Sequence, residues 1–429
     1  MRLAFSLLAS ILLSVSAFAD TLISNVTAIT MKGDEVIEGA YVYIRGDRIE
    51  YIGNGRYDPK DASNLEIIDG TGKFLIPGLA EMHGHLPQGA ANSQQAKDTL
   101  FLYLAGGVTT VRGMLGNPVQ FEMRQMIKEG VLDGPTLYLA APSLNGSTVS
   151  SPEQGAQLVE RYKNEGWDLL KIHPGLTLKE YDSIAKKAHE VGIGFGGHVP
   201  ADVGLIHALN KGQASIDHMD GFIQLAGGSD ERLSDEQIRH VVEQYNNAFK
   251  SWIVPTQPLF NILIGGGDVI RLNRRFENKY VSPETRGNWH NRIKAINRRA
   301  NSYIKDNRNR MLAELYKSGA NIVLGSDAPQ LYSVPGFSIW REIEALIKAG
   351  VTPEDMLVIG TRNAGDYFKG KDRFGTIQAG MRADLLLLDA NPLENSKNLF
   401  KQAGVMAAGR WYSRADIDAK LADIAARNK

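Results

Sequence analysis

A regular alternation of short apolar segments with amphipathic stretches, between residues 76 and 369, restricts the fold more than any other feature. The amphipathic stretches, such as TLKEYDSIAKKAHEVG, predict helices. The apolar segments predict eight strands: LIPGLAEMHGH, GVTTVRGM, PTLYLAAP, WDLLKIHP, IGFGGHVP, ASIDHM, SWIVPTQ and NIVLGSDAP. Strands that alternate with helices form parallel sheets. Eight such units in about 290 residues predict a (β/α)8 TIM barrel, and an open doubly wound sheet is the alternative.

The segments on either side of this region have a different pattern. Residues 20–75 contain β-branched and aromatic runs broken by Gly, Asp and Asn, and strand-like runs return in residues 370–429. We expect these two ends of the chain to pack on each other as a small β-sandwich domain. The chain has 429 residues and is 43% apolar, so a large core is available to both parts.

The first 19 residues resemble an export signal. Arg2 is followed by an apolar run and by Ala17-Phe18-Ala19, which matches an A-x-A cleavage site. Residues 1–19 therefore predict a signal peptide and a mature chain that is periplasmic or secreted from a bacterium. We expect no stable membrane anchor after cleavage, because the apolar run is short for a membrane span. An uncleaved anchor is the alternative.

Charge and cysteine content narrow the chemistry. The formal net charge is zero, which argues against nucleic acid as a partner and leaves a small molecule as the expected substrate. The chain contains no cysteine. Any bound metal must therefore be held by histidine, carboxylate or a less common ligand.

Polar side chains collect where the predicted strands end. Five of the nine histidines of the chain lie at such ends. The residues are His83 and His85 on the first strand, Lys171 and His173 on the fourth, His198 on the fifth, His218 on the sixth and Asp327 on the eighth. Barrel enzymes carry their active residues at these ends, and positions i and i+2 of a strand share a face. Several histidines with an aspartate suit one or two divalent cations better than acid–base chemistry alone.

The motifs that contain these residues resemble those of the amidohydrolase superfamily, in particular its imidazolonepropionase-related and Xaa-Pro dipeptidase-like branch. They are IDGTGKFLIPGLAEMHGH, LLKIHPG, GGHVP, SIDHMDG, LGSDAP and GTIQAGMRADLLLLDANPL. The likeness extends from about residue 21 to 415. A pair of histidines alone is weak evidence. The pair followed in this order by a lysine, two histidines and an aspartate is specific.

The resemblance implies a centre of two divalent metal ions. His83 and His85 would hold the more buried ion together with Asp327, and His198 and His218 would hold the second. Lys171 would be carboxylated by CO2 and bridge both ions, because a carbamate offers two anionic oxygens where an ammonium offers none. Zinc is the expected metal, although Mn, Fe or Co would also suit nitrogen and oxygen ligands.

Three further residues are predicted to support the ligands or contact the substrate. Glu81 stands where the superfamily more often has Asp before the two histidines, and we expect it to orient a ligand. His173 shares the fourth strand end with Lys171, and a substrate contact is as well supported as a purely structural role. His290 lies in the long segment described below.

These residues predict an exported metal-dependent amidohydrolase. The two ions would activate a water molecule, and Asp327 would take its proton and pass it to the leaving nitrogen. The expected substrate has an amide-type C–N bond, as in a dipeptide, an N-acyl amino acid or a cyclic amide. The same centre could serve an esterase, a lactonase or a phosphotriesterase. A non-catalytic binding protein on this fold is a further alternative, but it would be expected to lose ligands.

Residues 258–300 form a basic insertion after the seventh predicted strand. A loop after a barrel strand is normally a few residues, and this segment is about forty long. Its cations are Arg271, Arg274, Arg275, Lys279, Arg286, Arg292, Lys294, Arg298 and Arg299, against Glu277 and Glu284. We expect a lid in which an arginine holds a free carboxylate of the substrate. A solvated helical excursion or an oligomer contact is the alternative, and the chain is expected to form a homo-oligomer.

Overall fold

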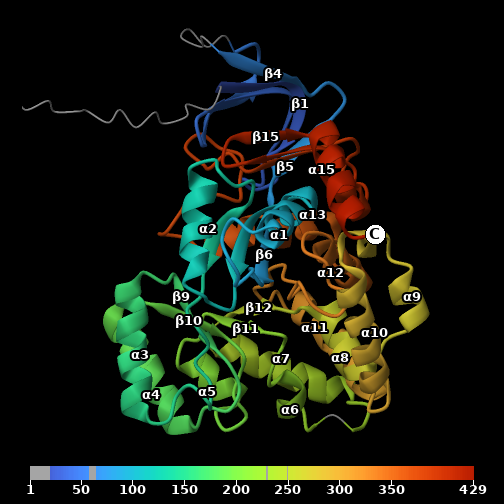
Figure 1. Cartoon of the computed structure of the whole chain (residues 1–429). Coiled ribbons are helices and arrows are strands. Elements are labelled where there is room, and N and C mark those ends of the chain that lie inside the picture. Colours follow the sequence, from blue (N-terminus) through green and yellow to red (C-terminus); the bar gives the residue numbers. More distant parts are fainter. Residues whose placement is uncertain (1–19, 58–63, 229, 249) are drawn as a thin grey trace, which may run out of the picture.

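The computed structural model describes residues 20–57, 64–228, 230–248 and 250–429 (Figure 1). The predicted signal peptide, residues 1–19, lies outside the described residues. Within the described ranges, none of the helices combines the length and the apolar character that crossing a bilayer requires.

Two parallel sheets form the centre of the larger part of the molecule. Their strands are almost entirely buried, as expected for sheets covered on both faces. The first sheet contains β6 (Leu79–Gly84), β7 (Val108–Gly113) and β8 (Thr136–Leu139). The second contains β9 (Leu169–Ile172), β10 (Gly194–Gly197), β11 (Ser215–Asp217) and β12 (Trp252–Val254).

Isolated parallel bridges connect these sheets. Ala140, directly after β8, pairs with Leu169 of β9, and Ile253 of β12 pairs with Ile322. Gly84 of β6 pairs with Ala328. The result is a TIM-barrel-like α/β arrangement in which residues 322–328 lie between β12 and β6.

The eighth predicted strand, NIVLGSDAP, is not a regular strand in the structure. Its residues form single bridges, and Asp327 has a φ of 59°, in the left-handed region. The chain therefore turns before consecutive pairs can form. The turn is held by the Asp327 amide, which donates to the carbonyl of His83 at 2.7 Å.

Helices alternate with the strands and cover the outside of the sheets (Figure 1). Local signals explain their limits: Thr177 and Glu180 form a capping box at the start of α4, and Gly192 with φ 64° ends it. The helices are α1 (Gln94–Ala105), α2 (Val119–Lys128), α3 (Pro152–Glu165), α4 (Leu178–Val191), α5 (Leu205–Asn210), α6 (Phe222–Leu225), α7 (Asp235–Asn247), α11 (Ser302–Lys317), α12 (Phe337–Lys348), α13 (Pro353–Gly360) and α14 (Arg362–Tyr367).

The two ends of the chain form one eight-stranded sheet, so the predicted β-sandwich is not confirmed. The strands are β1 (Asp20–Ile29), β2 (Val36–Arg45), β3 (Arg48–Asn54), β4 (Leu65–Asp69), β5 (Phe74–Pro77), β13 (Leu385–Leu388), β14 (Gln402–Ala407) and β15 (Arg410–Ser413). β5 pairs with both β1 and β13. The two ends therefore belong to a single hydrogen-bonded sheet, and side chains from both, such as Val42 and Leu387, pack in one apolar cluster. The short helix η2 (Ser396–Phe400) and the helix α15 (Arg414–Arg427) complete this region.

Gly78 separates this sheet from the barrel-like part. The sequence predicted one strand for LIPGLAEMHGH, but β5 ends at Pro77 and β6 begins at Leu79, in different sheets. A methyl group on Gly78 would overlap the side chain of Thr109. Only glycine therefore fits at this junction.

The basic insertion is helical and not an irregular loop. It contains α8 (Gln257–Gly265), α9 (Val269–Asn273), η1 (Phe276–Tyr280) and α10 (Pro283–Asn297). Apolar side chains explain this: Leu259, Ile262 and Ile293 pack in one cluster with Leu331 and Tyr332. The insertion is thus anchored on the segment that follows Asp327.

Candidate active site

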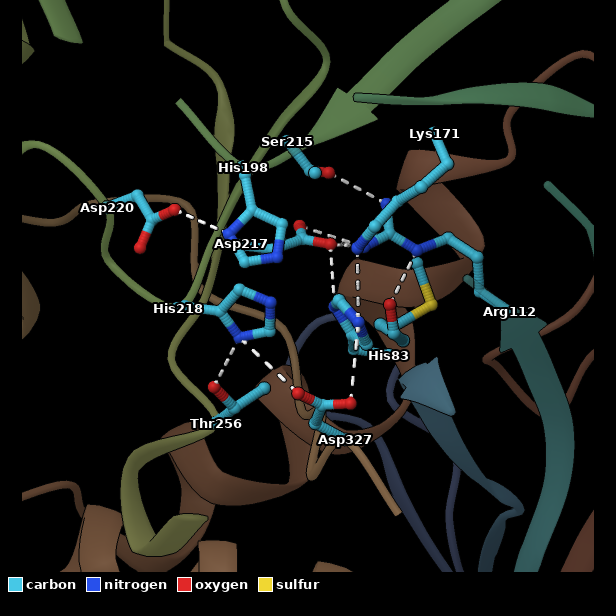
Figure 2. A network of polar contacts seen from close by, with 12 residues as sticks. His83, Arg112, Lys171, His198, Ser215, Asp217, His218, Asp220, Thr256 and Asp327 are labelled. Atoms are coloured by element: carbon cyan, nitrogen blue, oxygen red, sulfur yellow. Dashed lines mark hydrogen bonds and ion pairs between the residues drawn. The ribbon is translucent and has the colours of Figure 1, made fainter. Parts of the chain in front are cut away.

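Three buried side chains from different strand ends converge at the centre of the site (Figure 2). One potential ligand atom from each of His83, His218 and Asp327 lies within 4.8 Å of the other two. His83 lies on β6, His218 follows β11, and Asp327 lies on the segment bridged to β6. Residues that are distant in the sequence therefore face a common point.

The other three predicted ligands are their immediate neighbours. Lys171 places its Nζ 3.3 Å from Nε2 of His83. His85 places its Nε2 2.6 Å from Oδ1 of Asp327. The ring of His198 lies 4.4 Å from that of His218, between centroids. The structure brings all six sequence-predicted ligands together, and we call these six residues the histidine cluster.

Unusual backbone conformations direct these side chains. His218 has a φ of 64°, Thr256 a φ of 46° and Asp327 a φ of 59°. Non-glycine residues rarely adopt the left-handed region, and such residues concentrate at functional sites. Each of the three lies where the chain leaves a barrel strand, so the turn aims the side chain at the cluster.

Burial lowers the pKa of His83 and His218 and so favours their neutral form. Desolvation and, to a smaller extent, the charge of Lys171 hold the pKa of His83 well below its usual value. Desolvation and the neighbouring His198 do the same to the pKa of His218. A neutral imidazole is the form that coordinates a cation. Burial also lowers the pKa of Lys171 to about 8, although Asp217 and Asp327 oppose the shift.

A buried ion pair under His83 was missed in the sequence. Arg112 of β7 donates to both carboxylate oxygens of Asp217, each at 3.0 Å, and both side chains are fully buried. Oδ2 of Asp217 lies 2.7 Å from Nδ1 of His83. Arg112 and Lys171 outweigh the cost of burial and keep the pKa of Asp217 below its usual value. A signal existed, because an arginine inside the apolar run VTTVRG needs a buried partner.

Other partners hold His198 and His218. Nδ1 of His218 lies 2.8 Å from the Thr256 hydroxyl, and Nδ1 of His198 lies 2.7 Å from Oδ2 of Asp220. The buried guanidinium of Arg308 donates to the carbonyl of His218 at 2.6 Å. Asp220 could have been suspected, because it stands two residues after His218 in SIDHMDG. Thr256 and Arg308 carry no comparable signal.

Glu81, which the sequence predicted to support a ligand, contacts the backbone of the predicted ligand His83. Its Oε1 accepts hydrogen bonds from the amides of His83, at 3.2 Å, and Ser326, at 2.7 Å, and the Ser326 hydroxyl donates to Oε2. Desolvation raises the pKa of Glu81 to about 8. Glu81 thus ties the end of β6 to the residue before Asp327.

The two remaining candidates are placed differently. His173 lies next to the cluster, with its ring centroid 4.9 Å from that of His198 and its Nδ1 within hydrogen-bonding distance of the Ser143 hydroxyl. His290 lies on α10, where its Nδ1 is 3.4 Å from Nδ2 of Asn273. Within the described part of the chain, no hydrogen bond or ion pair connects His290 to the cluster.

The donor set fits divalent cations. It combines imidazoles, a carboxylate and a buried lysine, and the atoms of His83, His218 and Asp327 are close enough to share one ion. The imidazole–carboxylate set suits Zn²⁺ and other first-row ions. The supporting residues that touch the imidazoles are the kind that metal sites use to fix ring orientation.

A family comparison decides the assignment. The model of the amidohydrolase family matches residues 74–412. The chain belongs to the amidohydrolase family. Members of this family are hydrolases that act on carbon–nitrogen bonds and generally use divalent metals, so this amidohydrolase is an enzyme with a metal centre. The resemblance inferred from the motifs is confirmed.

Individual relatives of this amidohydrolase are distant. A 5-methylthioadenosine/S-adenosylhomocysteine deaminase from Thermoanaerobacter pseudethanolicus is 21% identical over 397 residues, covering 86% of this chain and 85% of that protein. An imidazolonepropionase from Paenarthrobacter aurescens is 24% identical over 153 residues, covering 34% of this chain and 37% of that protein. A deaminase from Caldanaerobacter subterraneus, 42% identical over 65 residues, is matched over only 14% of its length.

A solved structure supports the fold. A Xaa-Pro dipeptidase with bound methionine is similar with a TM-score of 0.67 and 20% sequence identity, covering 92% of this chain and 100% of that chain. The two chains therefore share the fold of a TIM-barrel-like hydrolase with an additional sheet.

Proposed function

We propose that the protein is an exported hydrolase that cleaves the amide-type C–N bond of a small molecule with the help of two divalent metal ions. One observation carries the proposal. His83, His85, Lys171, His198, His218 and Asp327 converge from five strand ends onto one buried point. A protein that had lost this chemistry would have no reason to retain all six residues.

The residues divide into two sets around Lys171. His83, His85 and Asp327 would hold one ion, and His198 and His218 the other. Lys171, carboxylated on Nζ, would reach both. The lowered pKa of Lys171, about 8, supports this role, because only the neutral amine reacts with CO2. When bound, divalent cations lower the pKa of water and polarise a carbonyl oxygen.

Asp327 would move the proton. Its carboxylate lies beside His83 and His85, where it can accept a proton from the attacking water and deliver it to the leaving nitrogen. Glu81 accepts a hydrogen bond from the amide of Ser326, the residue before Asp327, and this contact restricts the position of the Asp327 backbone. The Asp327 carboxylate would therefore act first as the base and then as the acid, and the site needs no further acid.

The finer expectations from the sequence are part of the same proposal. These are zinc as the metal, a fully closed (β/α)8 barrel over 76–369, cleavage of residues 1–19 with export to the periplasm or beyond, a homo-oligomer, and a substrate with a free carboxylate. His173 would contact that substrate, because its ring lies beside that of His198.

Hydrolytic deamination of a purine derivative is a second candidate. The extended match to a deaminase favours it. The amide hydrolase and the deaminase differ in how they would use Lys171. The amide hydrolase needs Lys171 as a bridge between two ions.

The test of the metal arrangement is Lys171→Ala. We expect the metal content to fall from two ions towards one per chain and activity to be lost, with partial recovery by added acetate. Elemental analysis of the purified chain measures the content. Lys179→Ala, an exposed lysine on α4, is the matched control and should keep both ions. Two ions in the Lys171 variant would refute the carbamate bridge.

The test of the reaction is a screen of the metal-loaded protein against dipeptides, N-acyl amino acids, cyclic amides, lactones and adenosine derivatives. Release of amine from an amide supports the proposal. Activity confined to lactones or to adenosine derivatives would replace it with the corresponding alternative.

A further inference from the structure

A second cavity lies away from the histidine cluster. Its volume is about 790 Å³, and it is enclosed by α8, α9, α11 and α12. No residue of the histidine cluster lines it. Three of the insertion's arginines, which the sequence placed over the active-site mouth, line this cavity instead. These arginines lie there because α8 and α9 pack beside α11 and α12.

The cavity carries an excess of positive charge. We call it the basic cavity, after its six cationic side chains: Arg271, Arg274, Arg275, Lys305, Arg341 and Lys348. Only two carboxylates, Asp268 and Glu344, face the same space.

Most of these charges are not neutralised inside the protein. Arg341 is paired with Glu277 at 2.8 Å and with Glu344 at 3.3 Å. The carboxylate of Asp268 caps α9 by accepting hydrogen bonds from the amides of Ile270 and Arg271. Five of the six cations form no ion pair within the ranges that the structure describes: Arg271, Arg274, Arg275, Lys305 and Lys348. Of these, Arg275 donates a hydrogen bond to the carbonyl of Tyr332 at 3.0 Å. Like charges gathered without counter-charges repel one another, and an anion would relieve that repulsion.

The remaining lining is largely apolar, with Asn261 and Asn309 as further polar members. Ile262, Leu272, Phe276 and Leu312 supply hydrocarbon and aromatic surface. A volume in the range of small-molecule sites, apolar walls and a few convergent polar groups are typical of a binding pocket. Arginine pairs with phosphate or carboxylate through two parallel hydrogen bonds.

We propose that the basic cavity binds a small organic dianion, a phosphomonoester or a dicarboxylate carried on an apolar body. The cations would hold its charged groups, and Phe276 and Leu272 would cover its apolar part. The site is separate from the histidine cluster and does not depend on the proposed hydrolysis.

The experiment titrates phenyl phosphate and, separately, phthalate into the metal-loaded full chain by calorimetry. We expect one of the two to bind at one site per chain, with an affinity that falls as salt increases. Preference for one probe identifies phosphate or carboxylate as the recognised group. Failure of both to bind would overturn the proposal.

Variants locate the binding. Arg271 and Arg274 are exposed, so Arg271→Gln with Arg274→Gln should fold, which the thermal midpoint checks. We expect this variant to bind the probe at least about tenfold more weakly. Arg292→Gln, an exposed insertion cation outside the cavity, should bind like the wild type. Binding that survives in the double variant but disappears in His85→Ala would assign the probe to the metal centre and overturn the proposal.

Discussion

The histidine cluster and the basic cavity handle charge in opposite ways. Around the cluster, the charged side chains of Arg112 and Asp217 come from strand ends, are buried and pair with each other. In the basic cavity, the cations come from helices and from the turn after α9, and Arg271 and Arg274 are exposed and form no ion pair in the described part of the chain. The buried charges around the cluster are balanced within the protein, apart from the metal ions that the site fits. The cations of the basic cavity lack a counter-charge, which a bound anion would supply.

The two regions share one wall. Pro258 and Ile262 of α8 line the basic cavity, while Phe260 of the same helix stacks on His218 with 4.5 Å between ring centroids. Gln257, at the start of α8, accepts a hydrogen bond from Arg308, which also holds the carbonyl of His218. A change in the position of α8 would therefore alter both the histidine cluster and the basic cavity.

The largest expected difference concerns catalysis. Asp327→Asn should retain most of the metal but lower kcat by about 10²–10⁴-fold, because an amide cannot accept the proton. Asp268→Asn, its counterpart in the basic cavity, should leave kcat within about twofold, since it only caps a short helix. Steady-state kinetics with elemental analysis measures both. Equal losses of kcat in the two variants would contradict the assignment of catalysis to the histidine cluster alone.

The next difference concerns stability. Arg112→Met leaves Asp217 buried without its partner, and we expect the free energy of unfolding to fall by about 3–5 kcal/mol. Arg274→Met removes an exposed, unpaired cation and should change it by less than about 0.5 kcal/mol. Urea unfolding at a fixed metal concentration compares them. A small effect of Arg112→Met would show that the buried pair contributes little.

The third difference concerns pH and involves Glu342, whose Oε1 accepts a hydrogen bond from the amide of Gln257 at the start of α8. Burial raises the pKa of Glu342 on α12 from 4.5 to about 8. Between these values the unfolded chain loses its proton and the folded chain keeps it, so this residue's stabilising contribution, fully present below pH 4.5, is lost as pH rises through 8. Each pKa unit corresponds to about 1.4 kcal/mol at most.

Glu342→Gln should remove that slope, so the variant gains stability over the wild type between pH 5 and 8. The thermal midpoint across this range measures the gain. Glu344→Gln on the same helix is the control, because Glu344 is partly exposed and paired with Arg341. Parallel profiles for wild type and Glu342→Gln would mean that Glu342 is ionised in the folded protein.

Sequence patterns predicted which residues converge at the site, but not which residues support them. His83 and His85 were predictable because strand periodicity and strand-end position constrain them together. Arg112 and Asp217 were missed because their pairing joins two strands that no local pattern relates. The sequence leaves the insertion open between a lid and a solvated helical excursion, because its apolar positions, such as Leu272 and Ile293, pack on the distant Tyr332 and do not follow one helical stripe. The predicted sandwich is not confirmed, because strand composition does not reveal which edges pair.

The position of β5 between β1 and β13 has a consequence for how the chain is made. Phe74 pairs with Leu388 and Pro77 with Leu385, partners about three hundred residues apart, a separation that slows folding. As the chain emerges from the ribosome N-terminus first, the edge of β5 stays open until the last strands exist. An open strand edge invites pairing with other chains. The terminal sheet can therefore reach its final form only after synthesis is nearly complete.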